Sequence, residues 1–116
     1  QRELALFGLK AHLKTMELMA AGKPAAKVVN EYENWVKAEG YGKYMLYGPC
    51  HAIGMMEVER PWMESTSTFD LEEKMTFQVD TFFSGEDFGL RWENGVVVRP
   101  GGVEKLSSKY MKLIEL

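Results

Sequence analysis

Residues 75–99 read MTFQVDTFFSGEDFGLRWENGVVVR, and this stretch decides the fold. Within it, residues 75–83 alternate between apolar and polar side chains, which is typical of a strand with one buried face. Residues 84–87 have the composition of a turn, and residues 88–99 continue as a second strand. The stretch therefore predicts two antiparallel strands with apolar side chains on one face and polar side chains on the other.

The second strand has two interpretations. The dipeptide Asn94-Gly95 favours a two-residue hairpin that folds residues 90–93 back onto residues 96–99. In the alternative, the strand is continuous and Gly95 marks a bulge or kink. The dipeptide alone slightly favours the hairpin, whereas the family resemblance described below favours the continuous strand, which we adopt.

Two helices are predicted before the strands, over residues 1–21 and 24–39. Apolar residues recur there at steps of three and four, as on the buried side of a helix. Gly22 is a suitable stop for the first helix, and Pro24 suits the first turn of the second. A short terminal helix is predicted over 106–116. The expected core positions are Leu6, Leu9, Leu13, Met16 and Ala20 in the first helix and Val28, Val29, Tyr32 and Val36 in the second.

The composition excludes several classes of protein. The 116 residues carry 14 basic and 17 acidic side chains, a net charge of −3, and the two signs alternate along the chain. We therefore expect no nucleic-acid groove and no polybasic membrane surface, and no apolar run is long enough to span a bilayer. One cysteine and eight methionines favour a reducing, cytoplasmic location. The chain begins at Gln1 without a leader, so we expect a processed start or a piece of a longer protein.

Four polar side chains stand in otherwise apolar stretches and form the candidate site. They are His51, Asp80, Arg91 and Glu93. An imidazole with two carboxylates is a ligand set suited to zinc, manganese, iron(II) or cobalt. If the strands pair through the turn at 84–87, Asp80 lies opposite Arg91 and Glu93 lies diagonal to it. The alternative is an ordinary cross-strand ion pair between Asp80 and Arg91, with Glu93 in solvent.

Two further side chains are assigned structural roles. Cys50 and His51 are neighbours in sequence, so in a strand they point to opposite faces and cannot act as a nucleophile and its base. Cys50 is therefore expected to be a small buried residue. His12 borders the apolar side of the first helix, and we expect it to serve the fold.

Three segments of the chain resemble motifs of one known family. Residues 50–54 read CHAIG, residues 76–80 read TFQVD, and residues 90–98 read LRWENGVVV. Their order is similar to that of the metal-binding motifs of methionine aminopeptidase, aminopeptidase P, prolidase and creatinase, which contain a histidine, a glutamate and a second glutamate. The connecting segments that also resemble the family are 21–24, 71–75 and 101–106.

The resemblance implies an α+β fold. It is the second half of a pita-bread fold, two helices followed by an antiparallel curved sheet, and residues 1–116 correspond to the C-terminal half of a catalytic domain. The metals of that family lie between two similar halves, and two aspartates come from the first half. We therefore expect the functional unit to need an N-terminal half, from the same domain or from a complementary chain.

The resemblance also implies an activity and a cofactor. His51, Asp80 and Glu93 would hold divalent ions (Mn, Co, Zn or Fe), two in each complete site, with His51 and Glu93 as catalytic residues. Arg91 would hold a ligand carboxylate in place. The expected protein is a homo-oligomeric hydrolase of the Xaa-Pro peptidase type, acting on a small peptide or an amide-like molecule.

Three positions depart from the family pattern. Asp80 stands where the family has glutamate, Thr81 where it has proline, and Val58 where a second histidine polarises the scissile carbonyl. Two alternatives therefore stay open. One is a creatinase-like or lyase-type enzyme on the same fold, which would need no metal if creatinase-like. The other is a non-catalytic, peptidase-like binding domain.

Overall fold

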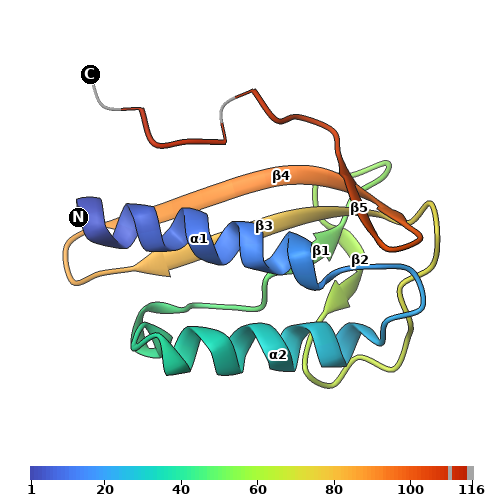
Figure 1. The fold of residues 1–116 in the computed structure, drawn as a ribbon, viewed down its shortest axis with the longest axis horizontal. Helices are drawn as coiled ribbons and strands as arrows, with labels where there is room; N and C mark the ends of the chain where they lie inside the picture. The colour runs from blue at the N-terminus through green and yellow to red at the C-terminus, as the bar shows by residue number, and fades with distance from the viewer. Residues whose placement is uncertain (110, 115–116) are drawn as a thin grey trace.

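The computed structural model describes residues 1–109 and 111–114, and in these residues two helices cover one face of an antiparallel sheet (Figure 1). The sheet has five strands in the order β2-β1-β3-β4-β5. The predicted α+β architecture is therefore confirmed. The elements are α1 (Arg2–Leu18), α2 (Ala25–Ala38), the 3-10 turn η1 (Gly42–Tyr44), β1 (Cys50–Ala52), β2 (Glu59–Met63), β3 (Thr76–Ser84), β4 (Gly89–Arg99) and β5 (Gly102–Lys105).

The register of β3 against β4 differs from the prediction. Asp80 pairs directly with Glu93, and Arg91 pairs with Phe82, so Arg91 is the diagonal neighbour of Asp80. The cause is the turn, which lies one residue later than expected because Ser84 still pairs with Gly89. Moving the turn by one residue shifts the partners by two positions. Since side chains alternate with a period of two, each one keeps its predicted face.

Strand β4 is continuous through Asn94-Gly95, so the hairpin interpretation is wrong. Gln78 pairs with Gly95 in an unbroken register, and Gly95 therefore marks no bulge either. A type I′ hairpin turn needs positive φ at both central residues, and neither has it. A Cβ at position 95 would lie 3.0 Å from Leu106 Cδ1, so the absence of a side chain at Gly95 leaves room for the side chain of Leu106.

The buried face of α1 matches the prediction at Met16 but not at Leu6 and Leu13. Leu6 and Leu13 are each 39% exposed. The helix instead turns small residues toward the sheet, and a Cβ at Gly8 would lie only 3.1 Å from Trp92 Cδ1. This close approach is possible because glycine has no side chain at the point of contact with Trp92. The residues of α1 that are buried are Leu4, Ala5, Phe7, Gly8, Ala11, His12, Thr15 and Met16.

The second helix and the sheet complete the core as predicted. The expected positions of α2 (Val28, Val29, Tyr32 and Val36) are all at most 1% exposed. They pack, with α1, against the face of the sheet that carries Phe77, Val79, Phe83, Val96 and Val98. Among the described residues, no helix covers the opposite face of the sheet, which holds His51, Asp80, Arg91 and Glu93.

The ends of the predicted helices need two corrections. Helix α1 ends at Leu18, earlier than expected, and Gly22 lies beyond it in a turn with φ of 85°, where its N–H donates to Leu71 O at 2.7 Å. Residues 106–109 and 111–114 are not helical, so the predicted terminal helix is wrong there. Its remaining residues, 110, 115 and 116, lie outside the described residues.

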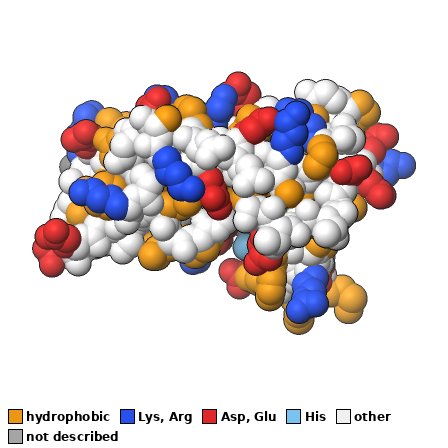
Figure 2. Space-filling model, turned by 90° about the horizontal axis from the view of Figure 1, so that it is seen from below, with side chains coloured by type: hydrophobic (Ala, Val, Ile, Leu, Met, Phe, Trp, Pro, Cys, Tyr) orange, Lys and Arg blue, Asp and Glu red, His pale blue; other side chains and the backbone are white. Residues whose placement is uncertain are grey.

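The surface shows no concentration of one charge on the face seen in Figure 2, where acidic and basic side chains are interspersed. This matches the alternation of signs in the sequence. In the part of the chain that the structure describes, neither helix combines the length and apolar character that crossing a membrane requires.

His12 gives the fold a predictable dependence on pH. It is fully buried, and burial is the main reason why its pKa lies below the ordinary 6.5, with Lys105 adding to the effect and Asn94 and Asp80 opposing it. Between the lowered pKa and 6.5 the unfolded chain binds a proton that the folded chain does not. We expect stability to fall as the pH drops below 6.5, by at most about 1.4 kcal/mol per pH unit from this group. Urea unfolding at pH 7.5, 6.0 and 5.0 measures this.

The matched control is His12→Gln, which has no titrating ring. Its unfolding free energy should change less between pH 7.5 and 5.0 than that of the wild type. Equal slopes for the two proteins would contradict the assignment.

Candidate metal centre

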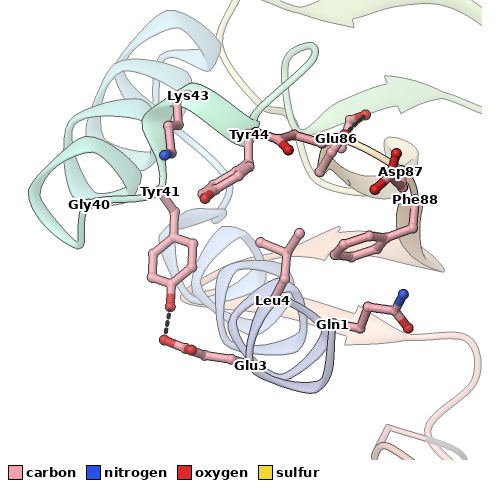
Figure 3. Close-up of a pocket in the computed structure, with 12 residues that line it drawn as sticks. Gln1, Glu3, Leu4, Gly40, Tyr41, Lys43, Tyr44, Glu86, Asp87 and Phe88 are labelled. Atoms are coloured by element: carbon pink, nitrogen blue, oxygen red, sulfur yellow. Dashed lines mark hydrogen bonds between the residues drawn. The ribbon is translucent and has the colours of Figure 1, made fainter.

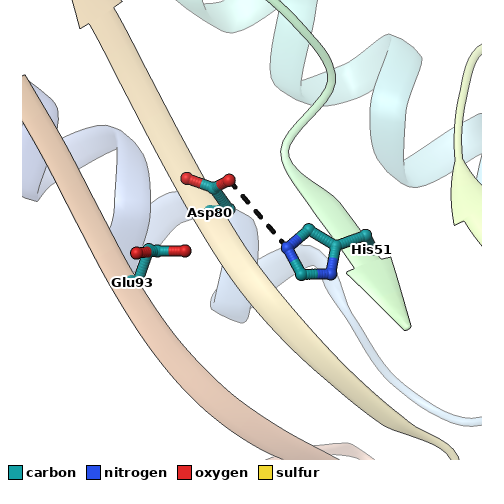
Figure 4. Close-up of side chains that lie close together, drawn as sticks. All are labelled: His51, Asp80 and Glu93. Atoms are coloured by element: carbon teal, nitrogen blue, oxygen red, sulfur yellow. Dashed lines mark ion pairs between the residues drawn. The ribbon is translucent and has the colours of Figure 1, made fainter. Parts of the chain in front are cut away.

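Three potential ligands meet on the helix-free face of the sheet. His51 comes from β1, Asp80 from β3 and Glu93 from β4, which are adjacent strands (Figure 4). One ligand atom from each lies within 4.8 Å of the other two. Two ligands of one ion, at about 2.2 Å each, lie at most about 4.4 Å apart, so only a small movement separates this arrangement from a ligand set. The residues that the sequence singled out are therefore together.

The imidazole of His51 is oriented by a backbone carbonyl. Its Nδ1 lies 3.1 Å from Ala52 O, which can only accept, so Nδ1 carries the proton of the neutral ring. That leaves the lone pair on Nε2, which lies 3.9 Å from Asp80 Oδ2. A histidine whose second nitrogen donates to a carbonyl has the arrangement usual for a metal ligand.

Asp80 has one satisfied oxygen and one unsatisfied oxygen. The Tyr47 hydroxyl donates to Oδ2 at 2.8 Å, whereas Oδ1 is buried without a hydrogen bond. Arg91 Nε is 3.4 Å from Oδ1, within ion-pair range. A buried carboxylate oxygen without a donor is costly in a folded protein unless a cation satisfies it. The donor set and this oxygen both fit a divalent ion.

Glu93 is the more exposed carboxylate of the pair, at 31% of its side chain. Partial burial, followed by the charge of Asp80 on the opposite strand, raises its pKa above the ordinary value, and Arg91 opposes that rise. Arg91 Nη1 lies 3.8 Å from Glu93 Oε2. One guanidinium therefore contacts both carboxylates and reduces their mutual repulsion.

Tyr47 also belongs to this cluster, although no sequence pattern pointed to it. Besides donating to Asp80, its hydroxyl accepts a hydrogen bond from Arg91 Nη2 at 2.9 Å, and its ring stacks on Phe82 at 6.0 Å. Burial and the bond to Asp80 raise the pKa of Tyr47 to about 12, so the phenol stays protonated near neutral pH. Its position four residues before His51, in a loop, has no periodicity that could have revealed it.

A cavity of about 370 Å³ opens beside these residues. Its wall includes Tyr47, His51, Asp80, Arg91 and Glu93. Apolar side chains and two further carboxylates complete the wall. The additional lining residues are Gly48, Cys50, Glu57, Val58, Trp62, Met63 and Glu64.

A larger cavity, of about 870 Å³, lies away from this cluster (Figure 3). Tyr41 and Tyr44 line it together with acidic and basic side chains, and the Tyr41 hydroxyl donates to Glu3 at 2.8 Å. None of its lining residues is a histidine or a cysteine. We therefore place the candidate site at the smaller cavity, where the ligand-type residues are.

Cys50 and His51 point to opposite faces, as predicted. The Cys50 thiol is buried on the helix side, 3.7 Å from Met19 Sδ, and burial raises its pKa far above the ordinary value. The thiol is therefore protonated and cannot reach His51 as a nucleophile would.

Removing the Tyr47 hydroxyl should destabilise the protein. In Tyr47→Phe, Asp80 loses a donor and Arg91 loses an acceptor, so we expect the free energy of unfolding to fall by about 1–2 kcal/mol. Urea unfolding of the metal-free protein measures this. Tyr44→Phe is the matched control, because the Tyr44 hydroxyl makes no hydrogen bond among the described residues. Equal losses in the two variants would contradict a role for the Tyr47 hydroxyl.

The sequence model of metallopeptidase family M24 matches residues 1–100. The chain belongs to this family. A curated relative of the M24 chain, the Xaa-Pro dipeptidase of Pyrococcus furiosus, is 24% identical over 115 residues, which is 98% of this chain and 33% of that protein. The structure of an Xaa-Pro dipeptidase from Bacillus anthracis matches with a TM-score of 0.90 and 25% identity, over 99% of this chain and 33% of the other.

A second solved structure extends the likeness. An X-Pro aminopeptidase from Thermotoga maritima matches the M24 chain with a TM-score of 0.87 and 24% identity, over 96% of this chain and 32% of the other. These matches confirm the pita-bread fold and the family resemblance. The M24 chain spans about a third of the length of these relatives. Membership of a metallopeptidase family implies divalent metal ions as the cofactor.

Proposed function

We propose that the complete protein is a metal-dependent hydrolase of the Xaa-Pro dipeptidase type, and that residues 1–116 form the C-terminal half of its catalytic domain. The observation that carries this proposal is the meeting of His51, Asp80 and Glu93 on one sheet face, with Asp80 Oδ1 buried and without a donor. The family and the names of the relatives support the reaction class.

The remaining ligands would come from outside this chain segment. We assign them to an N-terminal half of the same domain or to a complementary chain, because the chain covers 33% of its curated relative. Three ligands on one open sheet face form only one wall of a site for two ions. We expect manganese, cobalt, zinc or iron, and a homo-oligomeric protein.

Each side chain has a role in the proposed reaction. His51 Nε2 and the carboxylates of Asp80 and Glu93 would hold the ions, which supply an activated water and polarise the scissile carbonyl when bound. Glu93 would accept a proton from the attacking water and pass it to the leaving nitrogen, acting as a general base and then a general acid. Arg91 holds both carboxylates in place through its contacts at 3.4 and 3.8 Å.

Val58 favours a second candidate on the same fold. Its apolar side chain lines the cavity at the position where the resemblance places a carbonyl-polarising histidine. The complete protein would then cleave a C–N bond in a small amide-like molecule, without Xaa-Pro peptidase activity and, if creatinase-like, without metal.

One experiment separates the candidates. The full-length protein is stripped with EDTA, reloaded with Mn²⁺ or Co²⁺, and assayed for metal content and for hydrolysis of Ala-Pro, with Ala-Ala as control dipeptide. We expect bound metal and metal-dependent release of proline. Bound metal without hydrolysis of either dipeptide would favour the second candidate as a metal-dependent enzyme. A protein that binds no metal and cleaves no dipeptide would contradict the proposal.

A further inference from the structure

A buried histidine lies behind the candidate metal centre, on the opposite side of the sheet. His12 is completely buried on α1 and contacts both strands that carry the carboxylates. Its Nδ1 is 3.1 Å from Thr81 Oγ1 on β3, and its Nε2 is 2.8 Å from Asn94 Oδ1 on β4. One imidazole therefore connects α1, β3 and β4.

The direction of each hydrogen bond follows from the neighbours. Asn94 Nδ2 donates to Ser107 O at 3.1 Å and lies 2.9 Å from Ser107 Oγ, so the amide turns its oxygen toward His12. His12 Nε2 must then donate to that oxygen, and in the neutral ring Nδ1 accepts from the Thr81 hydroxyl. The bonds form a directed chain from Thr81 through His12 and Asn94 to Ser107.

The two residues that His12 contacts lie on either side of the directly paired residues Asp80 and Glu93. Thr81 follows Asp80 and Asn94 follows Glu93, while Asp80 and Glu93 pair directly across the strands. Because the strands are antiparallel, Thr81 and Asn94 lie on opposite sides of that pair, as diagonal neighbours. Such neighbours are roughly 7–8 Å apart, a span that an imidazole with a hydrogen bond at each end can cover.

We propose that His12 is a positioning residue for the metal centre: from behind the sheet it fixes the separation of Asp80 and Glu93. The inference rests on the proposed metal site. Holding two strands together at this pair limits sliding and splaying of the two carboxylates, which must converge on shared ions. Thr81, which stands where the resemblance places a proline, supplies a hydroxyl that proline lacks.

The test uses the full-length protein in its metal-free form. Titration calorimetry with Mn²⁺ is compared for the wild type, His12→Leu and Thr81→Val, and urea unfolding gives the stability of each. We expect the Mn²⁺ affinity of His12→Leu to fall about tenfold, and that of Thr81→Val to fall in the same direction by a smaller factor. Thr81→Val is nearly isosteric and carries the test if His12→Leu does not fold.

Two controls separate positioning from general loss of stability. Thr15→Val removes the hydroxyl of another completely buried residue of α1, which donates to Ala11 O at 3.2 Å within the same helix. Val36→Ala destabilises the core on α2, outside the metal cluster. Both should bind Mn²⁺ as tightly as the wild type.

The outcomes are distinct. Unchanged affinity in His12→Leu and Thr81→Val, or an equal fall in Val36→Ala, would overturn the positioning role while leaving the metal site intact. A wild type that binds no Mn²⁺ would overturn the proposed function and this inference together.

Discussion

Replacing His51 with alanine is expected to lower the affinity of the full-length protein for Mn²⁺ at least about 100-fold. Mutating residues that only hydrogen-bond to metal ligands lowers metal affinity by up to about 100-fold, and the loss of a ligand itself should cost at least as much. The imidazole offers its Nε2 lone pair to the cluster because Ala52 O fixes the proton on Nδ1. Alanine supplies no ligand atom, and Asp80 and Glu93 alone repel each other. Titration calorimetry measures the change, and hydrolysis of Ala-Pro should fall with it.

Gln78→Ala is the matched control for this variant. Gln78 pairs directly with His51 across β1 and β3 and lies on the same face, outside the three-residue cluster. Its replacement should leave Mn²⁺ affinity close to that of the wild type. A His51→Ala protein that binds Mn²⁺ as the wild type does would refute the assignment of His51 as a ligand.

Replacing Phe83 with alanine is expected to cause the largest loss of stability, about 3–5 kcal/mol. Phe83 is fully buried and meets the ring of Phe7 edge to face, with centroids 5.4 Å apart. The substitution removes apolar surface from the contact between α1 and β3 and leaves a cavity in a close-packed region. Urea unfolding monitored by circular dichroism measures the loss.

Leu6→Ala provides the comparison. Leu6 lies on α1 next to Phe7 but is 39% exposed, so its truncation creates no enclosed cavity. We expect a loss below about 1 kcal/mol. Similar losses for the two variants would show that Phe83 does not anchor the helix to the sheet.

Much of the fold could be predicted because its signals are local. The two-residue alternation in 75–83 and the helical spacing in 24–39 identified β3 and α2 and their buried faces. The buried face of α1 could not be chosen in this way. Leucines suggested one side of the helix, whereas the contact with Trp92 requires the small residue Gly8. Close approach depends on the partner surface, which one segment does not contain.

The candidate site was predictable in its members and only partly in its geometry. Alternation placed Asp80 and Glu93 on one face in both the predicted and the observed register, but the exact partners depended on a turn that lies one residue later than its composition indicated. Tyr47 was missed because its place beside Asp80 depends on the path of a loop. The position of His12 behind the carboxylates could not be predicted either, because it depends on how α1 packs against the sheet.

Odd-numbered and even-numbered residues of strand β3 lie on opposite faces of the sheet. Phe77, Val79, Thr81 and Phe83 are at most 1% exposed on the helix side, while the residues between them face the cavity side. In a saturation scan of this strand, tolerance should therefore alternate from one codon to the next. Apart from Thr81, whose hydroxyl contacts His12, the odd positions should govern how much protein accumulates in the cell, and the even positions should govern how active each molecule is. A library confined to the even positions would thus search for new substrates while largely preserving expression.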